Sequence, residues 1–344
     1  MAPRLSILDQ SPVSEGRNAA DAIGETLALA RLADELGFHR YWLAEHHNTE
    51  ALAGPAPEIL ISAVAATTRR IRVGSAGVML PHYSALKVAE QFRVLEGIAP
   101  GRIDLGVGRA PGSDGRTAFA LNPEAAQAAD RFPEQLRDLL GWLGDSLPEG
   151  HRFAAVRAQP AVPTRPEVWV LGSSDYGAQV AAYFGLPYCF AHFITEGRGA
   201  AEALALYRDG FRPGLIPAPH ASACVFALAA DTEAEAWRLF RSRELARVLR
   251  DSGRFVPLPS VETAERYPYN AAEQAQVERR RARAIVGTGA QVRDQLHALA
   301  AELGVQELAV LTACHDAAAR RRSYTLLAEA AGLTANLTDH SAAA

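Results

Sequence analysis

The chain alternates short apolar runs with amphipathic segments along almost its whole length, and this repeat limits its fold more than any other feature. Apolar residues recur at helical spacing in the amphipathic segments, whereas the runs between them are mostly continuous in Val, Ile, Leu and Ala. Such runs are typical of parallel strands buried on both faces. The expected strands are 4–9, 40–44, 71–80, 103–108, 168–171, 188–192, 221–228 and 307–311. The expected helices are 19–36, 57–68, 85–98, 122–143, 176–184, 199–210, 233–249, 291–303 and 317–331.

Eight strand–helix units in one direction, with no linker between them, favour a closed (β/α)8 TIM barrel over an open doubly wound sheet. We expect an α/β protein in which residues 1–344 form one domain. Two stretches exceed the usual βα loop, residues 109–121 after the fourth strand and residues 251–283 between the seventh and eighth strands. Long insertions on barrels commonly cover the active mouth, so we expect residues 251–283 to form a lid. The arginine run at 279–283 is interpreted as a solvated helix face.

Composition and cysteine usage exclude several classes of protein. A formal charge of −4 and a pI near 6.2 argue against binding to nucleic acid. The longest apolar run, residues 223–230, is too short to cross a bilayer, and the first residues do not resemble a signal peptide. Three cysteines, an odd and widely spaced set, provide neither a disulfide framework nor a metal-binding pair. We therefore expect a cytoplasmic location.

The carboxyl ends of the strands surround the catalytic mouth of a barrel, so polar residues that follow the strands are the candidates for chemistry. Asp9 ends the first expected strand, and Glu45, His46 and His47 follow the second. Adjacent histidines on a strand end project to opposite sides, so both do not easily bind one metal ion. A neutral imidazole here can act as a general base or proton donor, and a structural hydrogen bond is the alternative role. A metal hydrolase remains a weaker alternative, with further ligands from His192, His315 and Asp316.

The segment Gly172–Gly177 is a turn of small residues between the fifth strand and the next helix. It exposes backbone N–H groups at a helix N-terminus, where Ser173 and Ser174 can add hydroxyl donors for a phosphate. Asp175 would repel a phosphate dianion, so we expect it to point away or to cap the helix. Simple helix capping is the alternative for the whole segment.

Glycines cluster at the ends of the third and fourth strands, in segments 74–77 and 106–108. Small residues at this level either allow a flat ring system to approach the backbone or serve tight packing of the barrel. Arg109 follows directly and offers a fixed cation for a phosphate or a flavin carbonyl. An ion pair with Asp104 or Asp114 is its competing role.

Five segments taken together resemble the bacterial luciferase-like flavin monooxygenases, in particular their single-chain members. These segments are YWLAEHHN at 41–48, IRVGSAGVMLP at 71–81, PGRIDLGVGRAPG at 100–112, the turn at 172–177 with GLP at 185–187, and VGT at 286–288. They occur in the same order as in the family, across residues 4–330. Agreement of five segments is more specific than agreement of any one.

The resemblance implies a (β/α)8 enzyme that uses FMN as FMNH2, supplied by a separate NAD(P)H:flavin reductase, together with O2. It also implies a homodimer. By resemblance, His46 takes the position of the catalytic histidine of luciferase, and Arg109 that of an arginine on the phosphate side. The family contains a non-proline cis peptide in the third strand, which predicts one at Ala76–Gly77. The expected cofactor-binding residues are Asp9, Ser75, Ala76, Gly77, Gly108, Arg109, Ser173, Ser174, Tyr176 and Gly177.

One departure concerns the substrate. Luciferase has a reactive cysteine beside the flavin where this chain has Gly108, and the sequence of the insertion at 251–283 differs completely. The resemblance therefore favours a two-component monooxygenase that acts on a small organic substrate through a C4a-peroxyflavin, without light emission from a long-chain aldehyde. Two alternatives of the same fold remain open, an F420-dependent oxidoreductase and a non-catalytic flavin-binding protein.

Overall fold

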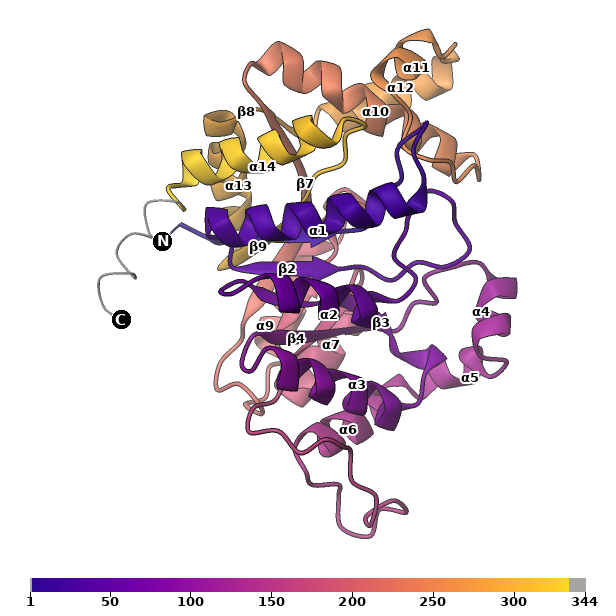
Figure 1. Ribbon diagram of the computed structural model, residues 1–344, viewed down its shortest axis with the longest axis vertical. Helices are drawn as coiled ribbons and strands as arrows, with labels where there is room; N and C mark the ends of the chain where they lie inside the picture. The colour runs from indigo at the N-terminus through magenta and orange to yellow at the C-terminus, as the bar shows by residue number, and fades with distance from the viewer. Residues whose placement is uncertain (1, 334–344) are drawn as a thin grey trace.

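Eight parallel strands close into a barrel in the computed structural model, which describes residues 2–333 (Figure 1). These strands are β1 (Arg4–Asp9), β2 (Arg40–Leu43), β3 (Arg72–Met79), β4 (Ile103–Gly108), β5 (Glu167–Gly172), β6 (Tyr188–Phe190), β7 (Ala221–Ala230) and β9 (Glu307–Leu311). Each strand from β1 to β6 pairs with the next one in the chain. The pairs β6–β7, β7–β9 and β9–β1 complete the ring. The predicted TIM barrel is confirmed.

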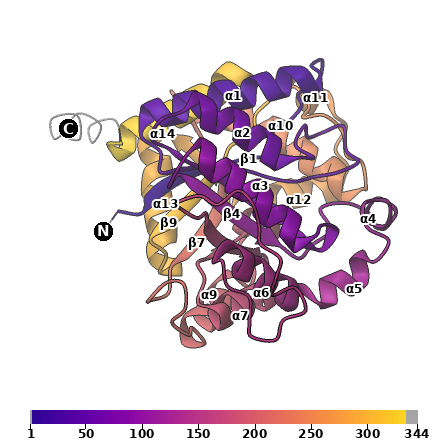
Figure 2. The ribbon, with the colours of Figure 1, turned by 60° about the horizontal axis from the view of Figure 1, so that its bottom comes forward.

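Helices surround the barrel and cover the outer faces of its strands (Figure 2). They are α1 (Ala19–Leu36), α2 (Pro57–Thr67), α3 (Ala85–Ile98), α6 (Phe132–Leu143), α7 (Asp175–Phe184), α9 (Ala200–Asp209), α13 (Gly289–Leu303) and α14 (Ala317–Ala331). In α1, Asn18 forms a capping box with Asp21, and Gly37 ends the helix with φ 85°. The predicted bounds of α1, α3 and α14 agree with the structure.

The prediction of one helix over residues 122–143 is wrong, because the segment contains two helices, α5 (Ala125–Asp130) and α6. Pro133 explains the break. Proline fits the first turn of a helix but not its interior, so a new helix begins at Phe132. The sixth strand also ends earlier than predicted, at Phe190, and residues His192–Thr195 form the short helix α8. The loop after β4 contains α4 (Gly115–Leu121), and η1 (Leu80–His82) follows β3.

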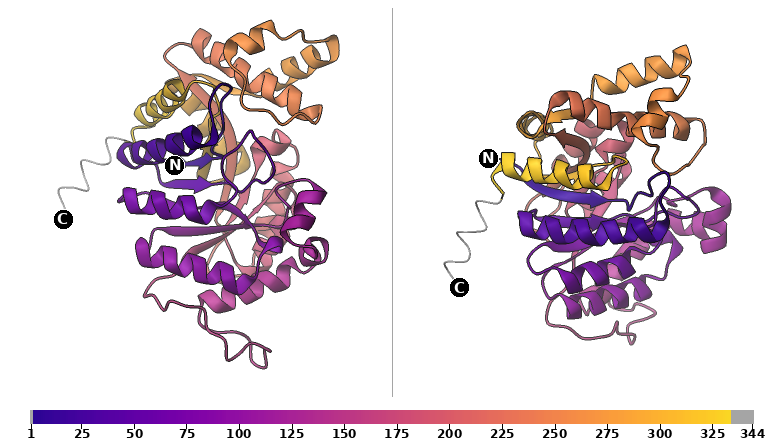
Figure 3. Two further views of the ribbon diagram at one scale, coloured as in Figure 1. Left: turned by 45° about the vertical axis from the view of Figure 1, so that its right-hand side comes forward. Right: turned by 45° about the horizontal axis from the view of Figure 1, so that its top comes forward.

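The segment between β7 and β9 projects beyond the barrel at one side of the molecule, shown in orange in Figure 3. It begins with α10 (Glu233–Asp251) and ends with β8 (Ile285–Thr288), and the predicted insertion at 251–283 between them contains α11 (Val261–Arg266) and α12 (Ala271–Arg281). The sequence analysis did not predict β8, which pairs only with the last four residues of β7, outside the ring. The insertion is tied to the loop after β1, because Leu258 N donates to Val13 O at 2.7 Å and Ser260 N donates to Glu15 Oε2 at 2.9 Å.

The arginine run at the end of α12 is only partly a solvated face. The Arg280 side chain is 16% exposed, and its Nε lies 3.0 Å from Glu196 Oε1. Arg281 donates to Glu244 Oε2 at 2.7 Å. The expectation therefore fails for Arg280, because Glu196, which follows α8, and Asp251 of α10 lie against it.

A buried ionic network closes the end of the barrel where the strands begin. Arg40 lies 2.8 Å from Asp104 and 3.0 Å from Glu307, and Trp42 Nε1 donates to Asp104 Oδ2 at 2.9 Å. Burial alone would lower the pKa of Arg40, but the charges of Asp104 and Glu307 raise it overall. Above this network lies an apolar cluster that includes Trp42 and Trp169, whose rings meet edge to face. Space inside the barrel is therefore left at the carboxyl ends of the strands.

No helix among residues 2–333 is both long and apolar enough to cross a membrane.

Candidate active site

A cavity of about 550 Å³ opens at the carboxyl ends of the barrel strands. Its size is within the usual range for sites that bind small molecules or cofactors. Its wall contains residues of β1 to β7, the turn before α7, helix α8 and the end of α10. Among the predicted site residues, those in the wall are His46, Ala76, Gly77, Gly108, Arg109, Ser173, Ser174, Tyr176 and Gly177.

His46 follows β2 and lines the cavity, whereas the side chain of His47 is directed elsewhere. The Nδ1 atom of His46 is buried and has no hydrogen-bond partner among the described residues. Burial, together with the charges of His47 and Arg250, lowers the pKa of His46 from 6.5 to about 4. The imidazole is therefore neutral at physiological pH and can accept a proton from a bound molecule.

Glu45 fixes the segment that carries His46. Its side chain is 1% exposed and accepts hydrogen bonds from Tyr83 Oη at 2.7 Å and from Met79 N at 2.9 Å. His47 Nε2 lies 2.7 Å from Glu45 Oε1. These contacts tie the end of β2 to the end of β3, which leaves the neighbouring His46 facing the cavity.

The turn at 172–177 forms another part of the wall. Ser174 is the N-cap residue of α7, but its side chain makes no capping hydrogen bond. The hydroxyls of Ser173 and Ser174 are exposed at the cavity rim, beside the first N–H groups of a ten-residue helix. Asp175 is also exposed but does not line the cavity. The capping alternative is thus not supported for the Ser174 side chain, and the turn has free donors for an anion.

Arg109 stacks on Tyr176, with its guanidinium carbon 3.9 Å from the ring centre. Neither of the ion pairs considered from the sequence is formed. Asp104 is bound by Arg40 and Arg72, and Asp114 caps α4 by accepting from the N–H groups of Arg116 and Thr117. Within residues 2–333, no carboxylate lies within ion-pair distance of Arg109.

The glycines of β3 and β4 have two different roles, since some serve close packing of the strands and one leaves space in the cavity. A Cβ atom on Gly74 would lie 2.3 Å from Asp104 O, and one on Gly106 would lie 2.2 Å from Ser75 O, so both serve close packing of the two strands. A Cβ atom on Gly108 would meet only the Met79 side chain, at 3.6 Å, so this position leaves space in the cavity. The predicted cis peptide at Ala76–Gly77 is present.

Two expected cofactor-binding residues are not in the cavity wall. Asp9 is fully buried behind the strand end. Its oxygens accept from Arg320, Tyr41, Thr26 and Ser11 N. Burial alone would raise the pKa of Asp9, but the Arg320 charge and these hydrogen bonds lower it overall. Ser75 is also buried, and its hydroxyl donates to Gly106 O at 2.8 Å. Both side chains are occupied by contacts within the protein and do not line the cavity.

Several wall residues were missed by the sequence analysis. They are Trp42, Met79, Phe132, Phe193, Ile194, Arg250 and Phe255. Trp42 and Met79 lie on predicted barrel strands, within the segments 41–48 and 71–81, so their positions were available from the sequence. The other five come from helices and loops whose position relative to the barrel no local pattern reveals. No group of three or more His, Cys, Asp or Glu side chains in the part of the chain described here is arranged to hold a metal ion.

Comparison with known proteins gives a consistent result. A family model described as luciferase-like monooxygenase matches residues 4–307. The chain is 47% identical to the uncharacterized protein YwcH of Bacillus subtilis over 330 residues, which cover 95% of this chain and 98% of the relative. It is 41% identical to the N-acetyl-S-alkylcysteine monooxygenase of the same organism over 331 residues, which cover 95% of this chain and 98% of the relative. The solved structure of apo-MsnO8 is similar with a TM-score of 0.87 and 40% identity, over 96% of this chain and 98% of that chain.

More distant solved structures share the fold alone. One is the oxygenating constituent of a 3,6-diketocamphane monooxygenase from Pseudomonas putida in complex with FMN, with a TM-score of 0.71 and 19% identity over 96% of this chain and 97% of that chain. Another is an F420-dependent secondary alcohol dehydrogenase, with a TM-score of 0.61 and 13% identity over 97% of this chain and 99% of that chain. The same architecture thus occurs in proteins with either cofactor.

Proposed function

The chain belongs to the luciferase-like monooxygenase family, and on this premise we propose that it is the oxygenase of a two-component system. It binds FMNH2 delivered by a separate NAD(P)H:flavin reductase and uses O2 to oxygenate a small organic substrate. The proposal rests on the composition of one cavity. One part of its wall contains Arg109 and the turn before α7, which can bind an anion, and another part contains the neutral His46.

The residues around the turn before α7 fit the phosphate of FMN. The Ser173 and Ser174 hydroxyls, the N–H groups at the start of α7 and the unpaired Arg109 all offer donors to an oxyanion. Tyr176 holds the Arg109 guanidinium by stacking. These residues would hold the phosphate group.

The wall formed by β3 and β4 fits a planar ring. Gly77 lines the cavity, but a Cβ atom on it would lie 2.6 Å from Leu171 Cδ1, so its lack of a side chain serves packing. Ala76 has only a methyl group, and the missing side chain of Gly108 leaves open space. A flat ring can therefore approach the strands closely. When bound there, FMNH2 supplies the activation of oxygen, and the protein supplies orientation and exclusion of water. Trp42 and Phe193 contribute apolar surface to the same cavity.

His46 is the proposed general acid or base. Its neutral ring lines the cavity, but its Nδ1 atom is enclosed by the protein, so Nε2 is the ring nitrogen that a bound molecule can reach. It can take a proton from the substrate or return one during turnover. A substrate screen begins with N-acetyl-S-alkylcysteines, because a relative with 41% identity carries that name.

Replacement of Arg109 with alanine tests the phosphate assignment. We expect the dissociation constant for FMN to rise about 10- to 100-fold, because a charged hydrogen-bonding partner of the phosphate is lost. Riboflavin lacks the phosphate, so its weaker binding should change little. Flavin fluorescence titration measures both values. Arg116→Ala, at an exposed position on α4, is the matched control. An equal loss for riboflavin, or no loss for FMN, contradicts the assignment.

A homodimer is proposed from an exposed apolar face on α2 and α3. Ile59 is 67% exposed, Val94 50% and Ile98 43%, although soluble surfaces usually scatter such residues singly. We expect Val94→Glu to convert a dimer into a monomer, because a charge buried in an apolar interface is unfavourable. Light scattering during size-exclusion chromatography measures the mass. Leu206→Glu, at an exposed position on α9, should leave the dimer intact. A monomeric wild-type protein contradicts this proposal.

We also propose that residues 1–344 form one domain, with the insertion at 251–283 as the cover of the active mouth. Phe255 from this insertion lies in the cavity wall, in agreement with that role.

A cytoplasmic location is proposed from the three buried cysteines, all of which are unpaired, as is usual in a reducing compartment.

A further inference from the structure

A second group of cations borders the cavity, on a different side from the turn before α7. Helix α10 presents Arg243, Arg247 and Arg250 at intervals of four and three residues, which places them on one face of the helix. Arg280 of α12 faces the same group. We call Arg243, Arg247, Arg250 and Arg280 the arginine cluster. In Figure 1, α10 and α12, which carry this cluster, lie in the upper part of the molecule, whereas α7 lies below the centre.

The carboxylates near the arginine cluster are too few to neutralise it. Glu196 lies 3.0 Å from both Arg247 and Arg280, and Asp251 forms a further close contact with Arg280. Glu244 is taken by Arg281. Two carboxylates are therefore shared within the cluster.

Two arginines of the cluster, and one nitrogen atom of each of the other two, have no anionic partner among the described residues. Neither Arg243 nor Arg250 forms an ion pair with any residue between 2 and 333. Arg243 lies over the Phe226 ring, 3.8 Å from its centre, and the Nη1 atoms of Arg247 and Arg280 are buried without hydrogen-bond partners. Arg243, Arg247 and Arg280 are half-buried, and like charges held together in such a site are unfavourable. Arg250 is exposed, so an anion can reach it from the cavity and offset the positive charge of the cluster.

Arg250 is the member of the cluster that reaches the cavity. It lines the wall together with Asp251, and it lies close enough to His46 for its charge to act on the imidazole. The acidic residues of the wall cannot neutralise it, because Glu45 is bound by Tyr83 and Met79 N, and Asp251 by Arg280. The same cavity wall contains the apolar side chains of Ile194, 48% exposed, and Phe255, 60% exposed.

We infer that Arg250 binds the anionic group of the organic substrate, and that this substrate is a small amphipathic carboxylate. The inference rests on the proposed function, because Arg109 is assigned there to FMN and Arg250 remains for the second ligand. The other members of the arginine cluster strengthen the positive potential behind Arg250. The apolar part of the substrate contacts the apolar rim, and its reacting atom lies toward His46.

The test compares matched carboxylates and amides on the FMN-loaded protein. The probes are hexanoate and hexanamide, benzoate and benzamide, and N-acetyl-S-methylcysteine and its amide, each titrated by isothermal calorimetry. The same titrations are made with Arg250→Gln, with Arg250→Lys, and with Arg241→Gln. Arg241 is an exposed residue of α10 that pairs with Glu265 away from the cavity, so it is a matched control.

We expect at least one carboxylate to bind wild type about tenfold more tightly than its amide, as for loss of one charged hydrogen bond. Arg250→Gln should abolish this preference, Arg250→Lys should restore part of it, and Arg241→Gln should keep it. The inference is overturned if no pair shows a preference, or if the preference survives in Arg250→Gln. Failure to bind FMN is a separate result that counts against the proposed function. The probes are then titrated against the flavin-free protein, where the same outcomes decide the inference.

Discussion

Replacement of His46 with alanine is expected to lower kcat by about 10²- to 10⁴-fold, the usual contribution of a general acid or base. The dissociation constant for FMN should change by less than about threefold, because His46 lies apart from the groups assigned to the phosphate. Turnover is measured with a substrate from the screen and FMNH2 from an added reductase, and flavin binding by fluorescence.

The pH profile separates proton transfer from a structural role. The pKa of His46 is lowered to about 4 by burial and by the charges of His47 and Arg250. The neutral form that accepts a proton is therefore present above that value, so kcat should stay level down to about pH 5 and then fall as the pH drops through 4. His46→Gln keeps a polar side chain that cannot take up a proton near neutral pH, so it should lose as much activity as His46→Ala. If glutamine restores turnover, or if alanine mainly weakens flavin binding, the proton-transfer role is wrong.

Replacement of Arg320 with methionine is expected to lower the free energy of unfolding by about 3–5 kcal/mol. The Arg320 side chain is 6% exposed and that of Asp9 is fully buried, with Nη2 2.7 Å from Oδ1. Without the guanidinium, Asp9 remains as a buried carboxylate with hydrogen bonds from Tyr41 and Thr26 but no counter-ion. Urea denaturation followed by far-UV circular dichroism measures the loss.

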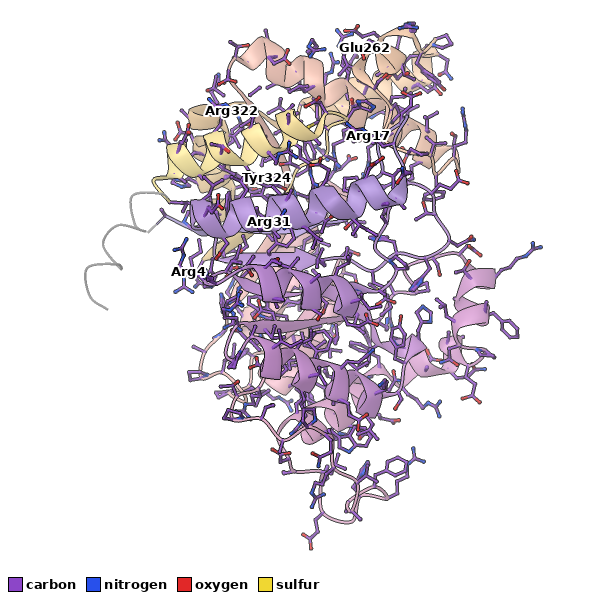
Figure 4. All side chains as sticks on the ribbon, in the orientation of Figure 1. Arg4, Arg17, Arg31, Glu262, Arg322 and Tyr324 are labelled. Carbon is purple, nitrogen blue, oxygen red and sulfur yellow. The ribbon has the colours of Figure 1, made fainter. Side chains whose placement is uncertain are left out.

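Two further variants show whether the loss comes from the unpaired charge. The double variant Asp9→Asn with Arg320→Met removes both charges and should recover most of the stability. Arg322→Met is the matched control, because Arg322 is an exposed residue of α14 that pairs with Asp231 at the surface. It should leave the free energy of unfolding nearly unchanged, because exposed ion pairs contribute little to stability. In Figure 4, Arg322 lies on the outer side of α14, whereas Tyr324 lies toward α1. A stable Arg320→Met variant would show that Asp9 does not depend on this pair.

The barrel was predictable because its signals are local. Continuous apolar runs mark strands buried on both faces, and residues such as Asn18 and Gly37 mark the ends of helices. The break before Phe132 was also encoded locally, by Pro133, but the apolar spacing across residues 122–143 concealed it. Strand β8 was not predictable, because four residues gain strand structure only by pairing with the end of β7.

The candidate site also contains some residues that the sequence could locate and others that it could not. His46 and the turn before α7 follow strands directly, so the rule that barrel mouths lie at strand ends located them. The same rule misplaced Asp9, which also ends a strand, because only the folded chain shows that Arg320 occupies its carboxylate across 311 residues of sequence. Arg250 ends α10 and Phe255 begins the insertion at 251–283, and the position of this insertion depends on contacts with the loop after β1. Contacts between segments so far apart leave no periodic pattern in the sequence.

The proposed function requires that the cavity bind reduced FMN for reaction with oxygen. An anaerobic titration of the purified chain with FMNH2, FMN and F420, followed by absorbance and fluorescence, measures this binding. We expect the tightest binding for FMNH2, and oxidation of the bound flavin when oxygen is admitted. Tighter binding of F420 without oxygen consumption, tight binding of oxidised FMN with no reaction, or binding of none of the three would contradict it.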